Sequence, residues 1–172
     1  MDVGDDHPSA HDLESREPSV EDLVNLCRDL NERGAKYLVI GGFAVRAAGY
    51  DRRTMDIDLL VELGADNEER VIEAVARLPD HAAQEIKPGE LAEYVIIRVA
   101  DEIVVDLMTS ASGIAYAEAA GEIVVHEVDA VSIPFASPRL LWRMKRSSLR
   151  DKDAPDIHFL RRLLERAGEL PE

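Results

Sequence analysis

Apolar residues recur along the chain at two spacings, and each spacing predicts one type of secondary structure. A first helix is predicted after Ser19, because its apolar residues follow one another at helical spacing, namely Val20, Leu23, Val24, Cys27 and Leu30. Asp22 stands three residues after Ser19, at the position that completes a capping box. Gly34 then ends the helix.

Short apolar runs between turn residues predict the strands, and longer periodic runs predict the other helices. We expect strands over 36–40, 56–62, 93–100, 102–108, 122–128 and 131–136, and helices over 43–48, 67–78, 113–120, 137–148 and 153–167. The tight corner at Ala100-Asp101 predicts a hairpin, and the last two strands form a second one. Pro134 suggests an edge strand. This order of elements predicts a mixed α/β fold with a helical C-terminal end.

The charge of the chain is distributed unevenly. Its 172 residues suit one domain, or one domain with an appendage, and they carry a net charge of −15. Residues 1–22 hold eight acids and one base, whereas residues 139–166 hold nine bases and four acids. We expect an acidic, disordered tail over 1–18, a core over 19–136 and C-terminal helices packed on it over 137–172. The total charge argues against a protein that coats nucleic acid, but the basic segment favours a phosphate-bearing ligand nearby.

The single cysteine, Cys27, excludes an intramolecular disulfide and a Cys-rich metal cluster. Its apolar helical position predicts a buried, inert thiol. The N-terminus has no basic region followed by an apolar stretch, and no apolar run reaches the roughly 20 residues of a membrane helix. The sequence therefore predicts a cytoplasmic protein without a membrane partner.

A strand that runs into Gly41-Gly42 and then into a helix is the first candidate for chemistry. Residues without side chains let backbone N–H groups approach an anion at the start of a helix. The segment lacks Gly-Lys-Ser/Thr and Gly-x-Gly-x-x-Gly, so it is neither a P-loop nor a dinucleotide fingerprint. Taken alone, it fits a plain tight turn better than a phosphate site.

Three aspartates strengthen the functional interpretation. Asp56 and Asp58 are two apart on a predicted strand, so both carboxylates face the same side, where they repel unless a cation lies between them. Asp106 interrupts an apolar strand, which is costly unless it is paired or bound to a metal. If these strands are neighbours, three carboxylates meet and can hold two Mg²⁺ or Mn²⁺ ions. The alternative is two solvent-facing acids and a salt-bridged Asp106.

Taken together, these residues resemble the polymerase-β-like nucleotidyltransferase superfamily. The pattern is Gly-Gly, a helix, Arg-x-Thr-x-Asp-x-Asp and a later strand Asp, which this chain carries at Gly41-Gly42, Arg53–Asp58 and Asp106. Its small bacterial branch, related to abortive-infection toxins, is similar in three more places: Val105–Ser110 followed by Gly113, the helix with Lys145, and Lys152–Asp156. The resemblance spans about residues 20–166 and implies the nucleotidyltransferase fold.

The resemblance also implies a role for each site residue. It assigns both metal ions to Asp56, Asp58 and Asp106, and the acceptor base to Asp106. It assigns the β and γ phosphates to the backbone of Gly41 and Gly42. Three further assignments concern the basic side chains: Arg53 contacts phosphate or braces the carboxylates, Lys145 reaches the triphosphate, and Lys152 joins Asp153 and Asp156 in building and capping the last helix or in acting directly.

The implied reaction moves an NMP from an NTP such as ATP to a hydroxyl and releases pyrophosphate. The acceptor is an RNA 3′ end such as that of tRNA, a protein or a small molecule, and a toxin role brings a cognate antitoxin as partner. Gly42 in place of the usual serine and the lack of a template-binding module favour transfer of one or a few nucleotides. A catalytically silent, antitoxin-like binding module and a phosphohydrolase are the alternatives.

Overall fold

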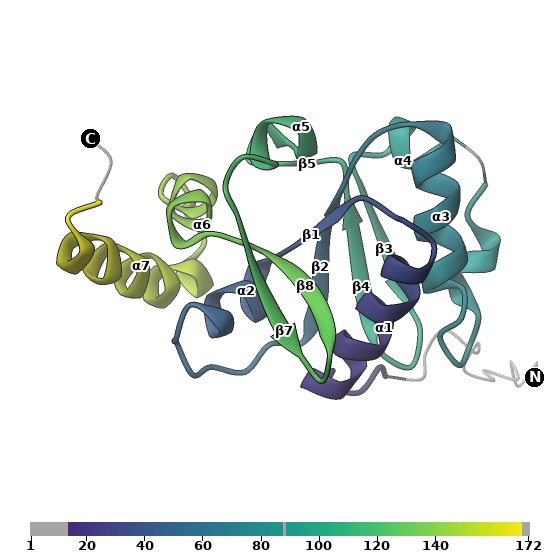
Figure 1. The fold of residues 1–172 in the computed structure, drawn as a ribbon, viewed down its shortest axis with the longest axis horizontal. Helices are drawn as coiled ribbons and strands as arrows, with labels where there is room; N and C mark the ends of the chain where they lie inside the picture. The colour runs from purple at the N-terminus through teal and green to yellow at the C-terminus, as the bar shows by residue number, and fades with distance from the viewer. Residues whose placement is uncertain (1–13, 88, 170–172) are drawn as a thin grey trace, which may run out of the picture.

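The computed structural model describes residues 14–87 and 89–169 (Figure 1). Its helices are α1 (Val20–Glu32), α2 (Gly41–Ala47), α3 (Ala65–Val75), α4 (Glu90–Glu93), α5 (Tyr116–Ala119), α6 (Pro138–Lys145) and α7 (Ala154–Ala167). Its strands are β1 (Tyr37–Ile40), β2 (Asp56–Val61), β3 (Ile96–Ala100), β4 (Val104–Met108), β5 (Ser110–Ala111), β6 (Ile114–Ala115), β7 (Ile123–Val128) and β8 (Val131–Ala136). Short 3-10 turns cover Ala82–Glu85 and Asp151–Asp153.

Six strands form one mixed sheet in the order β3-β4-β2-β1-β8-β7. The pairs β2–β4 and β1–β8 are parallel, and the other neighbours are antiparallel. Both predicted hairpins are confirmed, as β3–β4 and β7–β8. The mixed α/β class predicted from the order of elements is therefore confirmed, and β2 lies in the interior of the sheet between β1 and β4.

The prediction that Pro134 marks an edge strand is wrong. Its strand, β8, pairs with β7 on one side and with β1 on the other. A proline cannot donate a ladder hydrogen bond, and the ladder between β8 and β1 is correspondingly short, with Val39 opposite Phe135 as its one register pair. The edges of the sheet are β3 and β7.

Element boundaries differ from the predicted ones most clearly in two segments. Residues 113–120 were expected to be helical, but the chain forms the short β5–β6 pair there before α5 begins at Tyr116. The strand expected over 93–100 begins only at Ile96, because the residues before it form α4. In contrast, the capping box at the start of α1 is confirmed, since the side chains of Ser19 and Asp22 each accept a hydrogen bond from the backbone N–H of the other residue.

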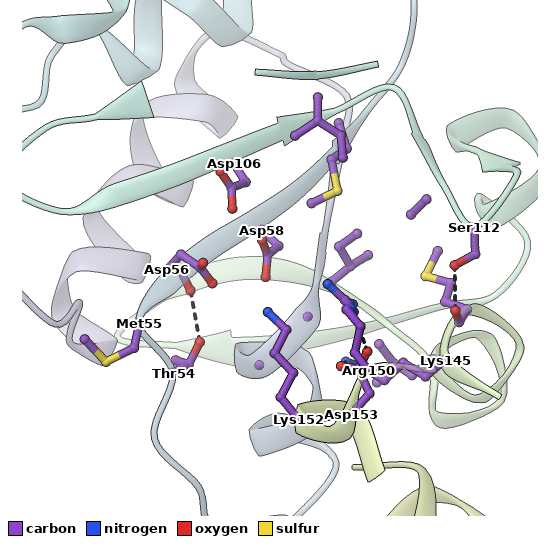
Figure 2. A pocket seen from close by; sticks show the side chains of 18 of the residues that line it. Thr54, Met55, Asp56, Asp58, Asp106, Ser112, Lys145, Arg150, Lys152 and Asp153 are labelled. Carbon is purple, nitrogen blue, oxygen red and sulfur yellow. Dashed lines mark hydrogen bonds and ion pairs between the residues drawn. The ribbon is translucent and has the colours of Figure 1, made fainter. Parts of the chain in front are cut away.

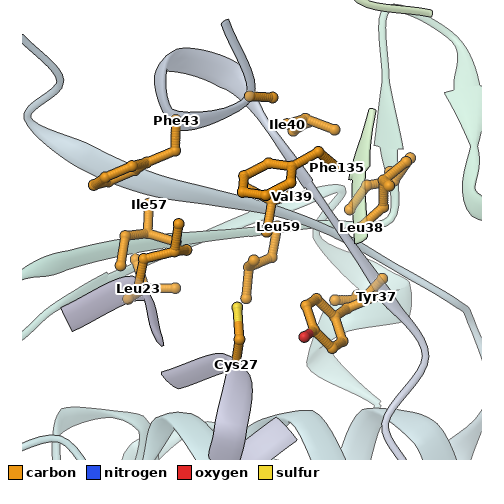
Figure 3. Close-up of a cluster of buried hydrophobic side chains, with 14 of the residues drawn as sticks. Leu23, Cys27, Tyr37, Leu38, Val39, Ile40, Phe43, Ile57, Leu59 and Phe135 are labelled. Carbon is orange, nitrogen blue, oxygen red and sulfur yellow. The ribbon is translucent and has the colours of Figure 1, made fainter. Parts of the chain in front are cut away.

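The core contains residues of the sheet and of α1, α2, α3, α6 and α7, and Cys27 of α1 is fully buried within it (Figure 3). Leu23 and Cys27 of α1 face the sheet residues Val39, Ile57 and Leu59, as the helical and strand spacings require. Burial raises the pKa of the Cys27 thiol to about 12. The cysteine is therefore a packing residue, as its position in the apolar pattern predicts.

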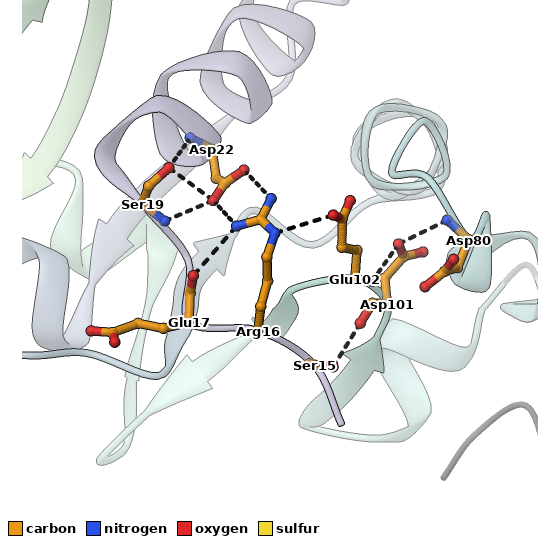
Figure 4. A network of polar contacts seen from close by, with 8 residues as sticks. All are labelled: Ser15, Arg16, Glu17, Ser19, Asp22, Asp80, Asp101 and Glu102. Atoms are coloured by element: carbon orange, nitrogen blue, oxygen red, sulfur yellow. Dashed lines mark hydrogen bonds and ion pairs between the residues drawn. The ribbon is translucent and has the colours of Figure 1, made fainter. Parts of the chain in front are cut away.

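The segment before α1 runs along the β3–β4 turn (Figure 4). The Ser15 hydroxyl donates to the Asp101 carbonyl, and Arg16 contacts both Glu102 and Asp22. Asp101 is buried and accepts hydrogen bonds from the backbone of Asp80, so the turn itself is held in place. Residues 1–13 of the predicted tail lie outside the described residues.

In the described part of the chain, we find no helix with both the length and the apolar character needed to span a membrane.

Candidate active site

The sheet register places four side chains in one row across adjacent strands. Arg98 of β3 lies opposite Asp106 of β4, Asp106 lies opposite Asp58 of β2, and Asp58 lies opposite Ile40 of β1. Asp56 is two residues before Asp58 on β2 and shares its face. The condition that the strands of Asp58 and Asp106 must be neighbours is therefore met.

The three carboxylates meet at one point of this face (Figure 2). Asp56, Asp58 and Asp106 each offer one oxygen, and these oxygens lie within 4.8 Å of one another. Burial, together with the charges of Asp56 and Asp106 and a hydrogen bond with Asp106, raises the pKa of Asp58 to about 7. Such a cluster is electrostatically unfavourable without a cation, and its hard oxygen donors are those that Mg²⁺ and Mn²⁺ prefer.

Gly41 and Gly42 begin α2 directly after β1 and lie against the carboxylate strand. Gly41 has a positive φ of 68°, and a Cβ atom at this position would overlap Oδ2 of Asp58. A Cβ atom on Gly42 would overlap the side chain of Thr54. The glycine pair is therefore required for the close approach of the α2 backbone to the acidic strand, and both glycines line the same pocket as the aspartates.

Arg98 is in direct contact with two of the three carboxylates. Its Nε and Nη2 donate to Oδ1 and Oδ2 of Asp106, both at 2.9 Å, and Nη2 also lies 3.2 Å from Oδ2 of Asp56. The Asp106 side chain is 8% exposed, whereas that of Arg98 is 61% exposed. The guanidinium thus covers the acidic cluster from its solvent side.

Lys145, which was expected to reach a triphosphate, lies in the pocket wall with its ammonium between two buried acids. Its Nζ is 3.3 Å from Asp153 and 3.2 Å from Asp156, and its side chain is 12% exposed. Asp156 also pairs with Arg52, at 2.8 Å. Burial alone would raise the pKa of Asp153, but the Ser148 hydroxyl and Lys145 outweigh it and lower the pKa. These pairs tie α6 and α7 to the loop before β2.

The expected capping role of the acids at the start of α7 takes a different form. Asp153 is the N-cap residue of α7, but its side chain makes no capping hydrogen bond. It accepts from Ser148 and Arg150 and pairs with Lys145 instead. Asp153 and Asp156 therefore fix the last helix through ion pairs rather than through its backbone.

The pocket over the carboxylates has a volume of about 550 Å³ and is lined by basic and by apolar side chains. Arg53 and Lys152 line it, and Figure 2 shows Lys152 pointing from the α6–α7 connection toward Asp56 and Asp58. Arg53 pairs with Glu17 at 2.7 Å, whereas Lys152 has no ion pair with the residues described. The apolar lining consists of Ile40, Met55, Ile96, Met108, Ala111, Leu141 and Met144.

A family model described as nucleotidyl transferases of unknown function matches residues 19–170. The chain belongs to this family. The matched range includes the carboxylates, the glycine pair and both C-terminal helices. No curated protein matches the chain.

The fold of this chain is also found in a solved structure. The chain is similar to a crystal structure from Thermotoga maritima described as a "putative nucleotidyltransferase", at 15% sequence identity and a TM-score of 0.50. The similarity covers 86% of this chain and 92% of the other. The predicted nucleotidyltransferase fold is thus confirmed.

Sequence reasoning missed Arg98 as a member of this site. The signal was present, because Arg98 is a lone charge in the apolar run Val95–Ala100, just as Asp106 is in its own strand. Two lone opposite charges in the two strands of one hairpin predict a cross-strand pair.

Proposed function

We propose that this nucleotidyl transferase uses divalent metal ions to transfer an NMP from an NTP to a hydroxyl group. The acceptor oxygen would bond to the α-phosphorus, the bond to the β-phosphate would break, and pyrophosphate would leave. The observation that carries the proposal is the convergence of Asp56, Asp58 and Asp106 within 4.8 Å in a pocket.

The donor set fits divalent ions. Asp56, Asp58 and Asp106 would hold two Mg²⁺ or Mn²⁺ ions, since carboxylate oxygens are their preferred ligands. Bound ions would offset charge on the triphosphate and lower the pKa of the acceptor hydroxyl. Asp106 would take the hydroxyl proton. Its bidentate contact with Arg98 leaves lone pairs on both carboxylate oxygens for this work.

The phosphates would lie between the start of α2 and the α6–α7 connection. Backbone N–H groups of Gly41 and Gly42 can approach an anion there, since neither residue has a side chain. Lys152 points toward the carboxylates and is the cation we assign to direct triphosphate contact. Arg53 would add to it after leaving Glu17. Lys145 acts mainly as a positioning residue, because its ammonium is held by Asp153 and Asp156.

Nucleotide transfer is tested with each of the four α-³²P-labelled NTPs, Mg²⁺ or Mn²⁺, and a total RNA and protein extract. Label on RNA, on protein or on a small molecule identifies the acceptor class. Wild type is compared with Asp58→Asn and with the control Asp51→Asn, an exposed aspartate outside the pocket. We expect labelling by wild type and the control and at least a hundredfold loss in Asp58→Asn.

Equal labelling by wild type and Asp58→Asn would contradict the assigned site. The absence of labelling with every nucleotide would favour the silent, antitoxin-like binding module. Growth arrest upon expression of wild type, relieved by Asp58→Asn, tests the toxin role, and rescue by a neighbouring gene product would identify an antitoxin.

A further inference from the structure

The guanidinium of Arg98 already occupies part of the space around the acidic cluster. Its Nη2 atom bonds to Asp106 at 2.9 Å and lies 3.2 Å from Oδ2 of Asp56. The contact is imposed by the fold, because the β3–β4 register sets Arg98 directly opposite Asp106. A cation therefore bridges two of the three groups that would hold metal ions.

The two contacts of Arg98 differ in strength. The pair with Asp106 is bidentate, with both distances at 2.9 Å, and Asp106 is nearly buried. The contact with Asp56 is single and longer, and the Asp56 side chain is 29% exposed. A metal ion entering the cluster would repel the guanidinium, and the weaker bond, to Asp56, would break first.

We propose that Arg98 is the resident counter-cation of the acidic cluster and competes with a divalent ion for Asp56. The inference rests on the proposed metal site. A metal ion alone then binds weakly, because it must displace the Arg98 guanidinium from Asp56 while Arg98 stays bound to Asp106. A triphosphate relieves this competition, since its negative charge gives the released guanidinium a new partner. Metal and nucleotide loading are thereby coupled through one side chain.

The experiment measures Mn²⁺ binding by electron paramagnetic resonance, first without nucleotide and then with a non-hydrolysable NTP analogue. Arg98→Gln removes the charge and keeps a polar side chain. Without nucleotide, we expect Arg98→Gln to bind Mn²⁺ about tenfold more tightly than wild type, because one neighbouring positive charge is gone. With the analogue, this advantage should fall to about twofold or less.

Two control variants separate the contact from a general effect of charge. Arg98→Lys keeps the charge and should stay within about threefold of wild type. Arg139→Gln removes an exposed charge that pairs with Glu122 outside the pocket rather than with the cluster, and should change Mn²⁺ affinity without nucleotide by less than about twofold. Circular dichroism melts confirm that each variant is folded.

The outcomes distinguish this inference from the proposed function. If Arg98→Gln binds Mn²⁺ no more tightly than wild type, Arg98 does not compete with the metal and the inference is overturned. If Asp58→Asn binds Mn²⁺ as well as wild type does, or if no variant binds it even with the analogue, the proposed metal site itself is wrong.

Discussion

Asp58→Asn should stabilise the metal-free protein while it abolishes metal binding. In the folded chain, the pKa of Asp58 is raised from 3.8 to about 7, because the carboxyl is buried beside Asp56 and Asp106. A raised folded pKa means that the folded state holds a proton that the unfolded state has lost. Unfolding free energy therefore falls as the pH rises from about 4 to about 7 and is level above that.

The magnitude follows from the size of the shift. Each pKa unit is worth about 1.4 kcal/mol, so ionised Asp58 lowers the unfolding free energy by up to about 4 kcal/mol above pH 7. Asparagine carries no charge and avoids this cost. The stabilisation by Asp58→Asn should therefore be larger at pH 8 than at pH 5 by about 2–3 kcal/mol.

Urea denaturation in EDTA at the two pH values measures this difference. Asp51→Asn is the control, because Asp51 is exposed and has no ion pair among residues 14–87 and 89–169. This variant should change the unfolding free energy by the same amount at both pH values. Added Mg²⁺ should raise the stability of wild type but not of Asp58→Asn, since ligands stabilise the state that binds them. If Asp58→Asn raises the unfolding free energy by the same amount at pH 5 and at pH 8, the electrostatic reasoning is refuted.

Three further predictions concern other parts of the fold. Gly41→Ala should lower the unfolding free energy by at least about 2 kcal/mol, measured by urea denaturation, because the new methyl group overlaps Asp58 and φ is positive. Asp156→Ala should cost about 3–5 kcal/mol in the same assay, since it leaves the nearly buried Lys145 without one of its carboxylate partners. Cys27 should react with Ellman's reagent only as fast as the protein unfolds, because the thiol is fully buried.

Each of these predictions has a contradicting outcome. Gly121→Ala, where a Cβ atom meets nothing within 4 Å, is the control for Gly41, and equal stability of the two variants would remove the steric argument. If Asp156→Ala has the same unfolding free energy as wild type, the ion pairs at the start of α7 contribute little to stability. Rapid labelling of Cys27 in the native protein would show that α1 opens on its own.

Local features of this fold could be predicted from the sequence, because neighbouring residues determine them. The capping box at Ser19 and both hairpins needed only spacing and turn residues. The shared face of Asp56 and Asp58 followed from the strand period. The meeting of these residues with Asp106 followed only conditionally, since no local signal says which strands pair in parallel.

Features that depend on distant segments could not be predicted in this way. β8 inserts beside β1, nearly 100 residues earlier in the chain, so Pro134 gave a misleading signal. The ion pairs of Lys145 with Asp153 and Asp156 could not be predicted either, because only the packing of α7 brings these acids close to it. Charge patterns along a sequence show which groups need a partner, but tertiary packing decides which partner each one finds.

The place of Arg98 on an edge strand has a consequence for solubility. β3 has an unpaired side, and the run Tyr94–Ala100 carries three large apolar side chains that are more than half exposed, Tyr94, Val95 and Ile96. Arg98 is the one charged residue in this run, and a charge on an edge strand discourages pairing with another chain. A neutral apolar replacement would leave this run of seven residues, most of them β-branched or aromatic, without a charge at an open edge. The arginine proposed as the counter-cation of the acidic cluster would thus also disfavour growth of the sheet by self-association at this edge.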